Sequence, residues 1–182
     1  MSMLIGTHNS GTGEPSKGLL SLLVLPFAKT QSKTVYEQYA HGCRLFDFRV
    51  RYDNNTLRIA HGIWTSKTTL INILSALKSR HDWLCTVTYE GSLDNELAKQ
   101  EFIERVLTIF KSYNCEKALV SIGTKKPWVS LTTLKTVDTR DNYKGINFET
   151  PRWMFPVPWV YDRLCSRPHT FNDSVYTIVD FF

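Results

Sequence analysis

Six side chains able to do acid-base or phosphate-binding chemistry lie on or directly after predicted strands of this sequence. They are His8, Asp47, Arg49, His61, Glu90 and Asp180. Two imidazoles suit phosphodiester chemistry because one can take a proton from the attacking oxygen while the other gives one to the leaving oxygen. A guanidinium can bind the phosphoryl oxygens as negative charge builds on them. These residue types therefore predict acid-base chemistry on a phosphodiester.

An alternation of strands and helices has to position these residues. Apolar segments of strand length lie at residues 3–5, 43–50, 57–60, 84–89, 118–122, 145–148 and 175–182. Helices are predicted at residues 19–28, 34–39, 69–79 and 95–113, and the proline-rich and tryptophan-rich residues 151–168 are expected to form a loop. Strand-helix alternation predicts a β/α barrel, whose functional residues gather at the carboxyl ends of the strands.

Two of the predicted strands carry the central part of this pattern. In residues 43–50 the strand period places Asp47 and Arg49 on one face, where they could also form a simple ion pair. Residues 53–55 form a predicted turn, after which the strand at residues 57–60 delivers His61 at its carboxyl end. We therefore expect His61 on the same barrel rim as His8.

The length limits how complete such a barrel can be. The chain has 182 residues, 42% of them hydrophobic and 21% charged, which excludes a disordered chain and predicts one domain over residues 1–182. A closed eight-stranded barrel takes roughly 200 residues or more. We expect an α/β fold, namely a single-domain, trimmed or irregular TIM-type β/α barrel.

The net charge favours an anionic partner. Lys and Arg total 22 against 17 Asp and Glu, which gives a formal charge of +5. No run of five or six basic residues indicates a nucleic-acid arm, so we expect a phosphate compound or an acidic membrane surface, no nucleic acid, and a monomer.

The four cysteines, at positions 43, 85, 115 and 165, are widely spaced and contain no CxxC pair. Neither a zinc site nor a redox dithiol is therefore predicted. Cys43 and Cys85 lie in apolar strands, so we expect reduced, structural cysteines, while two disulfides remain conceivable.

The longest apolar run covers residues 19–28 and is far shorter than the roughly 20 residues that cross a bilayer. Mostly polar residues precede it, which is not typical of a signal peptide. We therefore expect a cytoplasmic or released protein with peripheral membrane contact. The run itself is either a helix packed on the core or an exposed apolar lip that touches membrane.

Three motifs carry a resemblance to a known family. They are Gly6-Thr7-His8-Asn9-Ser10-Gly11-Thr12, then Tyr39-Ala40-His41-Gly42-Cys43-Arg44-Leu45-Phe46-Asp47-Phe48-Arg49, then Ala60-His61-Gly62. In this order they resemble the X region of phosphatidylinositol-specific phospholipase C in its bacterial form. The resemblance is specific up to about Glu90. After that point only short matches remain, at Lys144-Gly145-Ile146, Arg152 and Thr177-Ile178-Val179-Asp180.

The resemblance implies a barrel and a two-step cleavage through a cyclic inositol phosphate. His8 would be the general base for the inositol 2-hydroxyl, and His61 would be the general acid for the lipid leaving group. Asp180 would orient the base, Arg49 would bind the phosphate beside Asp47, and Arg152 would contact the inositol ring. Glu90 is a further expected substrate contact. The headgroup-stacking tyrosine would be Tyr143 or Tyr161.

Asn9 departs from the bacterial pattern, in which an Asp assists the general acid, and matches a ligand in the calcium-dependent type. Asn9, Asp47 and Glu90 could offer oxygens to Ca²⁺. Arg49, however, stands where calcium-dependent members have a carboxylate, and a fixed cation repels a metal and can replace it electrostatically. We predict that no cofactor is needed and that Asn9 contributes to substrate binding.

Other interpretations remain open. The chain could be a barrel that binds phosphoinositide or membrane without turnover, or a phosphodiesterase for a glycosyl-inositol anchor, another lipid or a glycerophosphodiester. Trp64, Trp153 and Trp159 are either interfacial anchors or core aromatics. The remaining histidines, at positions 41, 81 and 169, are expected to be structural.

Overall fold

The computed structural model describes residues 4–80 and 82–113 and, beyond them, five short strands at 118–122, 128–130, 136–137, 146–149 and 176–179. The elements are β1 (Leu4–Thr7), a 3-10 turn η1 (Ser10–Gly13), α1 (Gly18–Ala28), α2 (Val35–Ala40), β2 (Cys43–Asp53), β3 (Thr56–His61), β4 (Trp64–Thr69), α3 (Leu70–Leu77), β5 (Leu84–Tyr89), α4 (Glu96–Ser112), β6 (Ala118–Ile122), β7 (Trp128–Ser130), β8 (Thr136–Val137), β9 (Ile146–Glu149) and β10 (Tyr176–Val179). The four predicted helices are confirmed, as is a strand within each predicted strand segment. The predicted loop at residues 151–168 lies outside the described residues.

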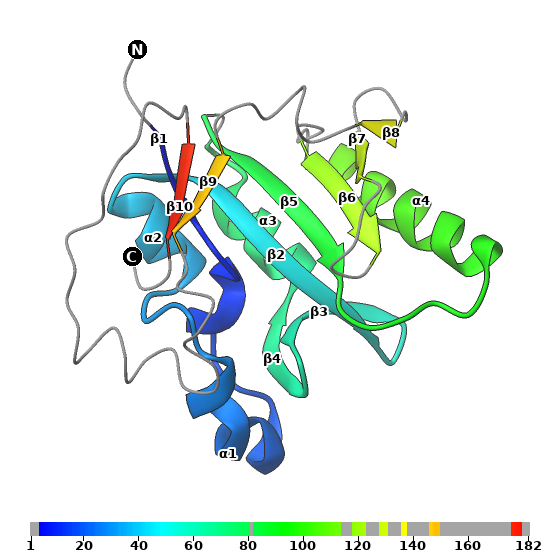
Figure 1. The fold of residues 1–182 in the computed structure, drawn as a ribbon, viewed down its shortest axis with the longest axis horizontal. Helices are drawn as coiled ribbons and strands as arrows, with labels where there is room; N and C mark the ends of the chain where they lie inside the picture. The colour runs from blue at the N-terminus through cyan, green and yellow to red at the C-terminus, as the bar shows by residue number, and fades with distance from the viewer. Residues whose placement is uncertain are drawn as a thin grey trace.

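The described strands form one curled, mixed sheet (Figure 1). Its centre is a parallel run in the order β6-β5-β2-β1-β10-β9, and β7 and β8 continue it in antiparallel fashion from β6. The last strand pairs with the first, as it does in a barrel, with Thr7 opposite Val179. This curled sheet with its helices confirms the trimmed α/β barrel.

The path of β3 differs from the prediction. The strand-helix alternation placed His61 at the carboxyl end of another barrel strand, but β3 runs antiparallel to β2. Asn54 and Asn55 have φ angles of 48° and 59°, a left-handed pair that reverses the chain tightly after Asp53. The hairpin therefore carries His61 back along β2, toward the residues that follow β1.

The strand β4 was not predicted from the sequence. Its residues Trp-Thr-Ser-Lys-Thr-Thr show no alternation of apolar and polar side chains, so the strand period is absent. Among the named strands, β4 pairs only with β3, and an edge strand tolerates polar residues on both faces. Trp64 is fully buried and its Nε1 donates to Ser16, so its interpretation as a core aromatic is confirmed.

The core lies on one face of β2, and the site lies on the other. Phe46, Phe48 and Val50 are fully buried in the apolar cluster. Asp47 and Arg49 alternate with them and point to the opposite face. The predicted alternation along residues 43–50 is therefore confirmed, and it sets two opposite charges side by side.

Local side-chain caps explain where the helices begin. Thr34 and Glu37 form a capping box at α2, and Thr69 and Asn72 form a similar one at α3. Asn95 accepts from the backbone of Ala98 at the start of α4. None of the helices within the described ranges is long and apolar enough to cross a membrane.

Cys43 and Cys85 are buried and carry reduced thiols, so the predicted reduced state is confirmed for these two residues. Burial raises the pKa of the Cys43 thiol to about 11, which keeps it protonated and unreactive. Cys115 and Cys165 lie outside the described residues.

Candidate active site

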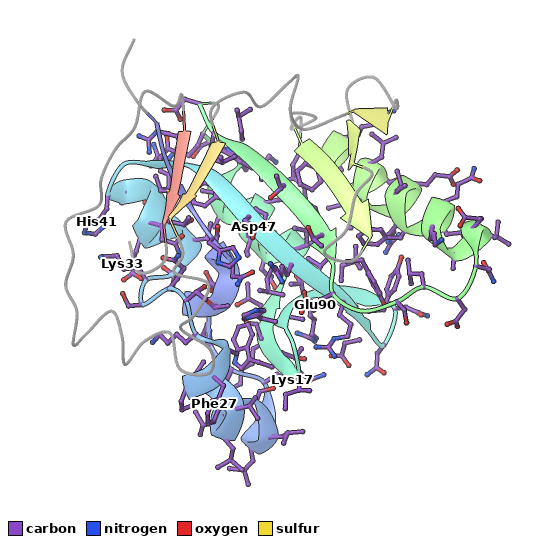
Figure 2. All side chains as sticks on the ribbon, viewed as in Figure 1. Lys17, Phe27, Lys33, His41, Asp47 and Glu90 are labelled. Carbon is purple, nitrogen blue, oxygen red and sulfur yellow. The ribbon has the colours of Figure 1, made fainter. Side chains whose placement is uncertain are left out.

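Six of the eight predicted site residues come together where β1 and β5 end beside the middle of β2 and the β3 hairpin returns. They are His8, Asn9, Asp47, Arg49, His61 and Glu90. Figure 2 labels Asp47 on β2 and Glu90 just after β5. The other two predicted residues, Asp180 and Arg152, lie outside the described residues.

Asp47 is a buried carboxylate, 7% exposed, that holds the turn after β1. Its Oδ2 accepts from the backbone N–H of Asn9 at 3.1 Å, and its Oδ1 accepts from the hydroxyl of Thr86 at 2.8 Å. The backbone N–H of Asp47 in turn donates to Ser10 Oγ at 2.8 Å. Thr86 was missed by sequence reasoning, although the parallel register places it opposite Asp47 on β5.

Arg49 lies between an imidazole and two carboxylates. Its Nη2 is 3.3 Å from Nε2 of His8, its Nη1 is 3.4 Å from Oε2 of Glu90, and its Nε is 3.9 Å from Oδ2 of Asp47. A guanidinium has no acceptor, so Nε2 of His8 must present its lone pair in this contact. The contact therefore suits a neutral His8, the form in which a general base accepts a proton.

His61 is fixed by the end of helix α1. Its Nδ1 lies 2.8 Å from the carbonyl oxygen of Ala28, and a carbonyl only accepts, so Nδ1 carries the proton. This leaves Nε2 to face the site, 3.3 Å from the amide nitrogen of Asn9. Burial is the largest cause that lowers the pKa of His61, Arg49 lowers it further, and the bond to Ala28 opposes them.

The amide of Asn9 can serve either protonation state of His61. Asn9 is 2% exposed, and its Oδ1 has no hydrogen-bond partner among the described residues. Its nitrogen can donate to the neutral imidazole, and rotating the amide by half a turn brings the oxygen to accept from an imidazolium. Unlike a carboxylate, the amide adds no charge that would raise the pKa of His61.

Both oxygens of Glu90 already bind protein groups. Oε1 accepts from the backbone N–H of Gly62 at 2.8 Å, and Oε2 faces Arg49. Glu90 therefore braces the guanidinium and the turn directly after His61. Its predicted contact with substrate stays a prediction.

The arrangement bears on metal binding. Among the side chains that the structure describes, no three from His, Cys, Asp or Glu gather as metal ligands. The guanidinium of Arg49 contacts Glu90 and is within ion-pair distance of Asp47, the two carboxylates that would have to hold Ca²⁺. A calcium ion there would face a fixed positive charge at close range.

Several residues that were named from the sequence are not among the described residues of this site. His41 is exposed and its Nδ1 lies 2.7 Å from the carbonyl of Glu37, which fits its expected structural role. The remaining residues named from the sequence lie outside the described residues: His81, His169, Tyr143, Tyr161, Trp153 and Trp159.

The fold belongs to a known class of solved structures. The chain aligns over 98% of its length with phosphatidylinositol-specific phospholipase C from Listeria monocytogenes, at a TM-score of 0.63 and 15% identity, covering 87% of that chain. It aligns over 98% with the Staphylococcus aureus phosphatidylinositol-specific phospholipase C carrying pentafluoro-Phe, at a TM-score of 0.57 and 14% identity, covering 85% of that chain. No protein-family model and no curated protein matches the sequence. At this identity the likeness establishes the fold, which is the one that the motifs implied.

Proposed function

We propose that this protein is a phosphodiesterase that cleaves the glycerol-phosphate bond of phosphatidylinositol-type lipids through a cyclic inositol phosphate. The observation that carries the proposal is the placement of two imidazoles around one guanidinium. His8 contacts Arg49 through Nε2, and His61 presents Nε2 to the same site beside Asn9. The shared fold with bacterial phosphatidylinositol-specific phospholipases C supports the substrate class.

In the first step, Nε2 of His8 takes the proton of the inositol 2-hydroxyl, and that oxygen bonds to phosphorus. The bond from phosphorus to the glycerol oxygen breaks, and Nε2 of His61 gives its proton to that oxygen. Diacylglycerol leaves, and the cyclic phosphate stays. In the second step the water oxygen bonds to phosphorus while His61 takes a proton from the water. The bond from phosphorus to the inositol 2-oxygen breaks, and His8 gives its proton to that oxygen. Both imidazoles regain their starting states.

Arg49 supplies the positive charge in this scheme. Phosphoryl oxygens gain negative charge as the fifth bond to phosphorus forms, and the fork of Arg49 can bind two of them. Before substrate arrives, Glu90 bonds to the guanidinium and Asp47 lies within ion-pair distance of it. We therefore propose catalysis without a metal ion, with activity that survives a chelator.

The family resemblance implies that His61 faces the lipid leaving group, and the position of His61 at the end of α1 supports this assignment. His61 is bonded to the last residue of α1, whose exposed face is apolar, and Ile63 in the following turn is 67% exposed. A leaving group that carries acyl chains would depart more favourably toward such a surface. His8 faces the charged side of the site, which suits the inositol hydroxyl.

Helix α1 supports a membrane-bound substrate. Its apolar side chains Leu19, Leu20, Leu22, Leu23 and Phe27 are between 56% and 72% exposed. Figure 1 shows α1 projecting from the sheet, and Figure 2 shows Phe27 on this projecting part. So large an exposed apolar cluster is typical of a membrane or protein contact. We propose that this surface, the α1 face, contacts lipid.

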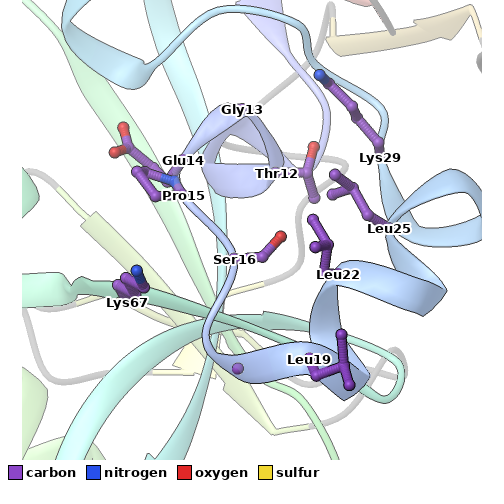
Figure 3. Close-up of a pocket in the computed structure, with 11 residues that line it drawn as sticks. Thr12, Gly13, Glu14, Pro15, Ser16, Leu19, Leu22, Leu25, Lys29 and Lys67 are labelled. Carbon is purple, nitrogen blue, oxygen red and sulfur yellow. The ribbon is translucent and has the colours of Figure 1, made fainter.

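A hollow of about 580 Å³ lies beside the same helix. Figure 3 shows leucine side chains of α1 on one side of it and the chain from Thr12 to Ser16 on the other. Lys29 and Lys67 also line it, which suits the border between acyl chains and anionic headgroups.

Two further roles stay as proposals. Val179 pairs with Thr7, the residue before His8, and Asp180 follows Val179 in the sequence. We keep Asp180 as the carboxylate that orients His8. The resemblance alone supports Arg152 as a contact to the inositol ring.

A substrate panel tests the proposal. Purified protein is incubated with phosphatidylinositol, a glycosyl-inositol anchor and a glycerophosphodiester, and ³¹P NMR follows the products. The proposal predicts a cyclic inositol phosphate signal that precedes the open monoester. Lipid binding without any product would instead indicate a membrane-binding barrel, and cleavage of the glycerophosphodiester alone would indicate another phosphodiesterase.

A further inference from the structure

The segment 28–31, which begins at the last residue of α1, contacts both proposed catalytic histidines through three of its four residues. The carbonyl of Ala28 accepts from Nδ1 of His61 at 2.8 Å. The hydroxyl of Thr30 and the amide of Gln31 both donate to the carbonyl oxygen of His8, each at 3.0 Å. The segment 28–31 is therefore bonded to the ring of one histidine and to the backbone of the other.

This segment is anchored by a closed set of hydrogen bonds. Oγ1 of Thr12 accepts from the backbone N–H groups of Thr30 and Gln31, each at 3.0 Å, and lies 3.0 Å from Oγ1 of Thr30. Because the hydroxyl proton of Thr30 goes to His8, the hydroxyl of Thr12 must donate to Thr30. Thr12 and Thr30 are 2% exposed and Gln31 is 0% exposed, so water cannot replace these bonds.

The peptide between His8 and Asn9 is consequently held from both sides. Its carbonyl accepts the two donors of segment 28–31, and its N–H donates to Asp47. Asn9 has a φ of 46° and a ψ of 48°, a left-handed conformation that few non-glycine residues adopt. Such a conformation persists when its surroundings determine it fully.

We propose that Thr30 and Gln31 are positioning residues that set the place of His8 relative to His61. The inference rests on the proposed function, in which both imidazoles must reach one phosphodiester. A displacement of about 1 Å in a catalytic group can lower a rate by roughly 100-fold. The Thr30 and Gln31 side chains do not contact the substrate in this scheme; they act through the backbone of His8.

The test separates the hydroxyl of Thr30 from its shape. Thr30→Val keeps the volume and removes the donor, while Thr30→Ser keeps the donor. Ser66→Ala is the matched control, because Ser66 is also fully buried and also donates to a backbone carbonyl, that of Pro15. Gln31→Met removes the second donor at similar size. Activity is measured on a monomeric short-chain phosphatidylinositol, so that membrane contact does not enter.

We expect Thr30→Val and Gln31→Met to lower kcat by about 10- to 100-fold, with KM within about twofold of the wild-type value. Thr30→Ser and Ser66→Ala should retain the wild-type kcat. Equal kcat values for Thr30→Val and Thr30→Ser would overturn the inference. So would equal losses in Thr30→Val and Ser66→Ala, which would indicate a general loss of packing.

A second readout keeps the inference testable if the proposed substrate is wrong. Long-range ¹H–¹⁵N NMR spectra report the tautomer and titration of each histidine ring without any substrate. Thr30→Val should displace the ring resonances of His8, and Thr30→Ser should not. Unchanged His8 resonances in Thr30→Val would overturn the positioning role. If the wild type is inactive but the His8 resonances still move in Thr30→Val, only the proposed function is refuted.

Discussion

At the scale of single residues, Arg49 matters for its shape as well as its charge. The guanidinium reaches His8, Glu90 and Asp47 from one planar group, which a lysine ammonium cannot do. Arg49→Lys should therefore keep the positive charge and still lower kcat by about 100- to 1,000-fold. Steady-state kinetics on phosphatidylinositol check this.

The matched control for that change is Arg105→Lys on the exposed side of α4. It should leave kcat unchanged. Wild-type kcat in Arg49→Lys would contradict the role of the fork and leave only a charge requirement at this position.

The protonation of His61 predicts the pH dependence. Its pKa lies below the ordinary value of 6.5, chiefly because it is buried. As a general acid His61 must start protonated, so kcat/KM should fall as pH rises through a midpoint below 6.5. Asn9→Asp places a carboxylate beside Nε2, raises that pKa, and should move the falling limb to higher pH. Rate profiles between about pH 5 and 8 measure both effects.

Asn95→Asp controls for the added negative charge, because Asn95 caps α4 and an aspartate caps equally well. Its rate profile should match that of the wild type. A falling limb that does not move in Asn9→Asp would exclude His61 as the group that titrates.

The sequence motifs predicted six residues that the structure places together, but not the atoms that hold them. The carbonyl of Ala28 is a backbone group, so no residue type indicates that it fixes His61. Thr30 and Gln31 lie beyond a helix end in an ordinary polar stretch, and only the tertiary fold brings them to His8. Thr86 was within reach of prediction through strand register.

At the scale of elements, α1 carries the proposed contact with lipid. Leu20 and Leu23 are each 65% exposed on the α1 face. A double variant, Leu20→Ser with Leu23→Ser, should bind phosphatidylinositol-containing vesicles at least roughly tenfold more weakly. The reason is that each leucine that enters the membrane contributes at least about 1.5 kcal/mol. Vesicle sedimentation measures the binding, and activity on monomeric substrate should not change.

Leu97 provides the matched control, because it is also 65% exposed but lies on α4. Leu97→Ser should bind vesicles as the wild type does. Equal vesicle binding by the Leu20→Ser, Leu23→Ser protein and by Leu97→Ser would place the lipid contact elsewhere.

The turn between β2 and β3 decides where His61 arrives. Asn55 has a φ of 59°, which a β-branched residue adopts only at a cost of about 1 to 2 kcal/mol. Asn55→Val should lower the free energy of unfolding by that amount, as measured by urea denaturation. Asn55→Gly, which suits a left-handed φ, should be as stable as the wild type or more so. A fully stable Asn55→Val would contradict the tight reversal.

At the scale of the whole molecule, the sequence predicted the parallel strands because each is an apolar run of the expected length. It did not predict β4, β7 and β8, which are short or polar and pair antiparallel at the margins of the sheet. It also misjudged the direction of β3, because strand period does not report direction. The motif grouped His61 with the other candidate site residues, where the structure places it, whereas the predicted path to it was wrong.

The pairing of β10 with β1 joins the two ends of the sequence at the proposed site. Thr7 pairs with Val179 on one side and with Phe46 on the other. The end of β1 therefore lies between the middle of β2 and the end of β10. The described site residues themselves come from β1, β2, the β3 hairpin and the end of β5, all within residues 4–90.

The most direct test of the account is release of inositol phosphate from phosphatidylinositol in mixed micelles, by wild type, His8→Ala and His61→Ala, with calcium and with chelator. We expect wild-type activity to survive the chelator and each histidine variant to lose about 100- to 10,000-fold in rate. Activity that requires calcium would contradict the role given to Arg49. If either histidine variant keeps wild-type activity, the two imidazoles do not carry the chemistry together.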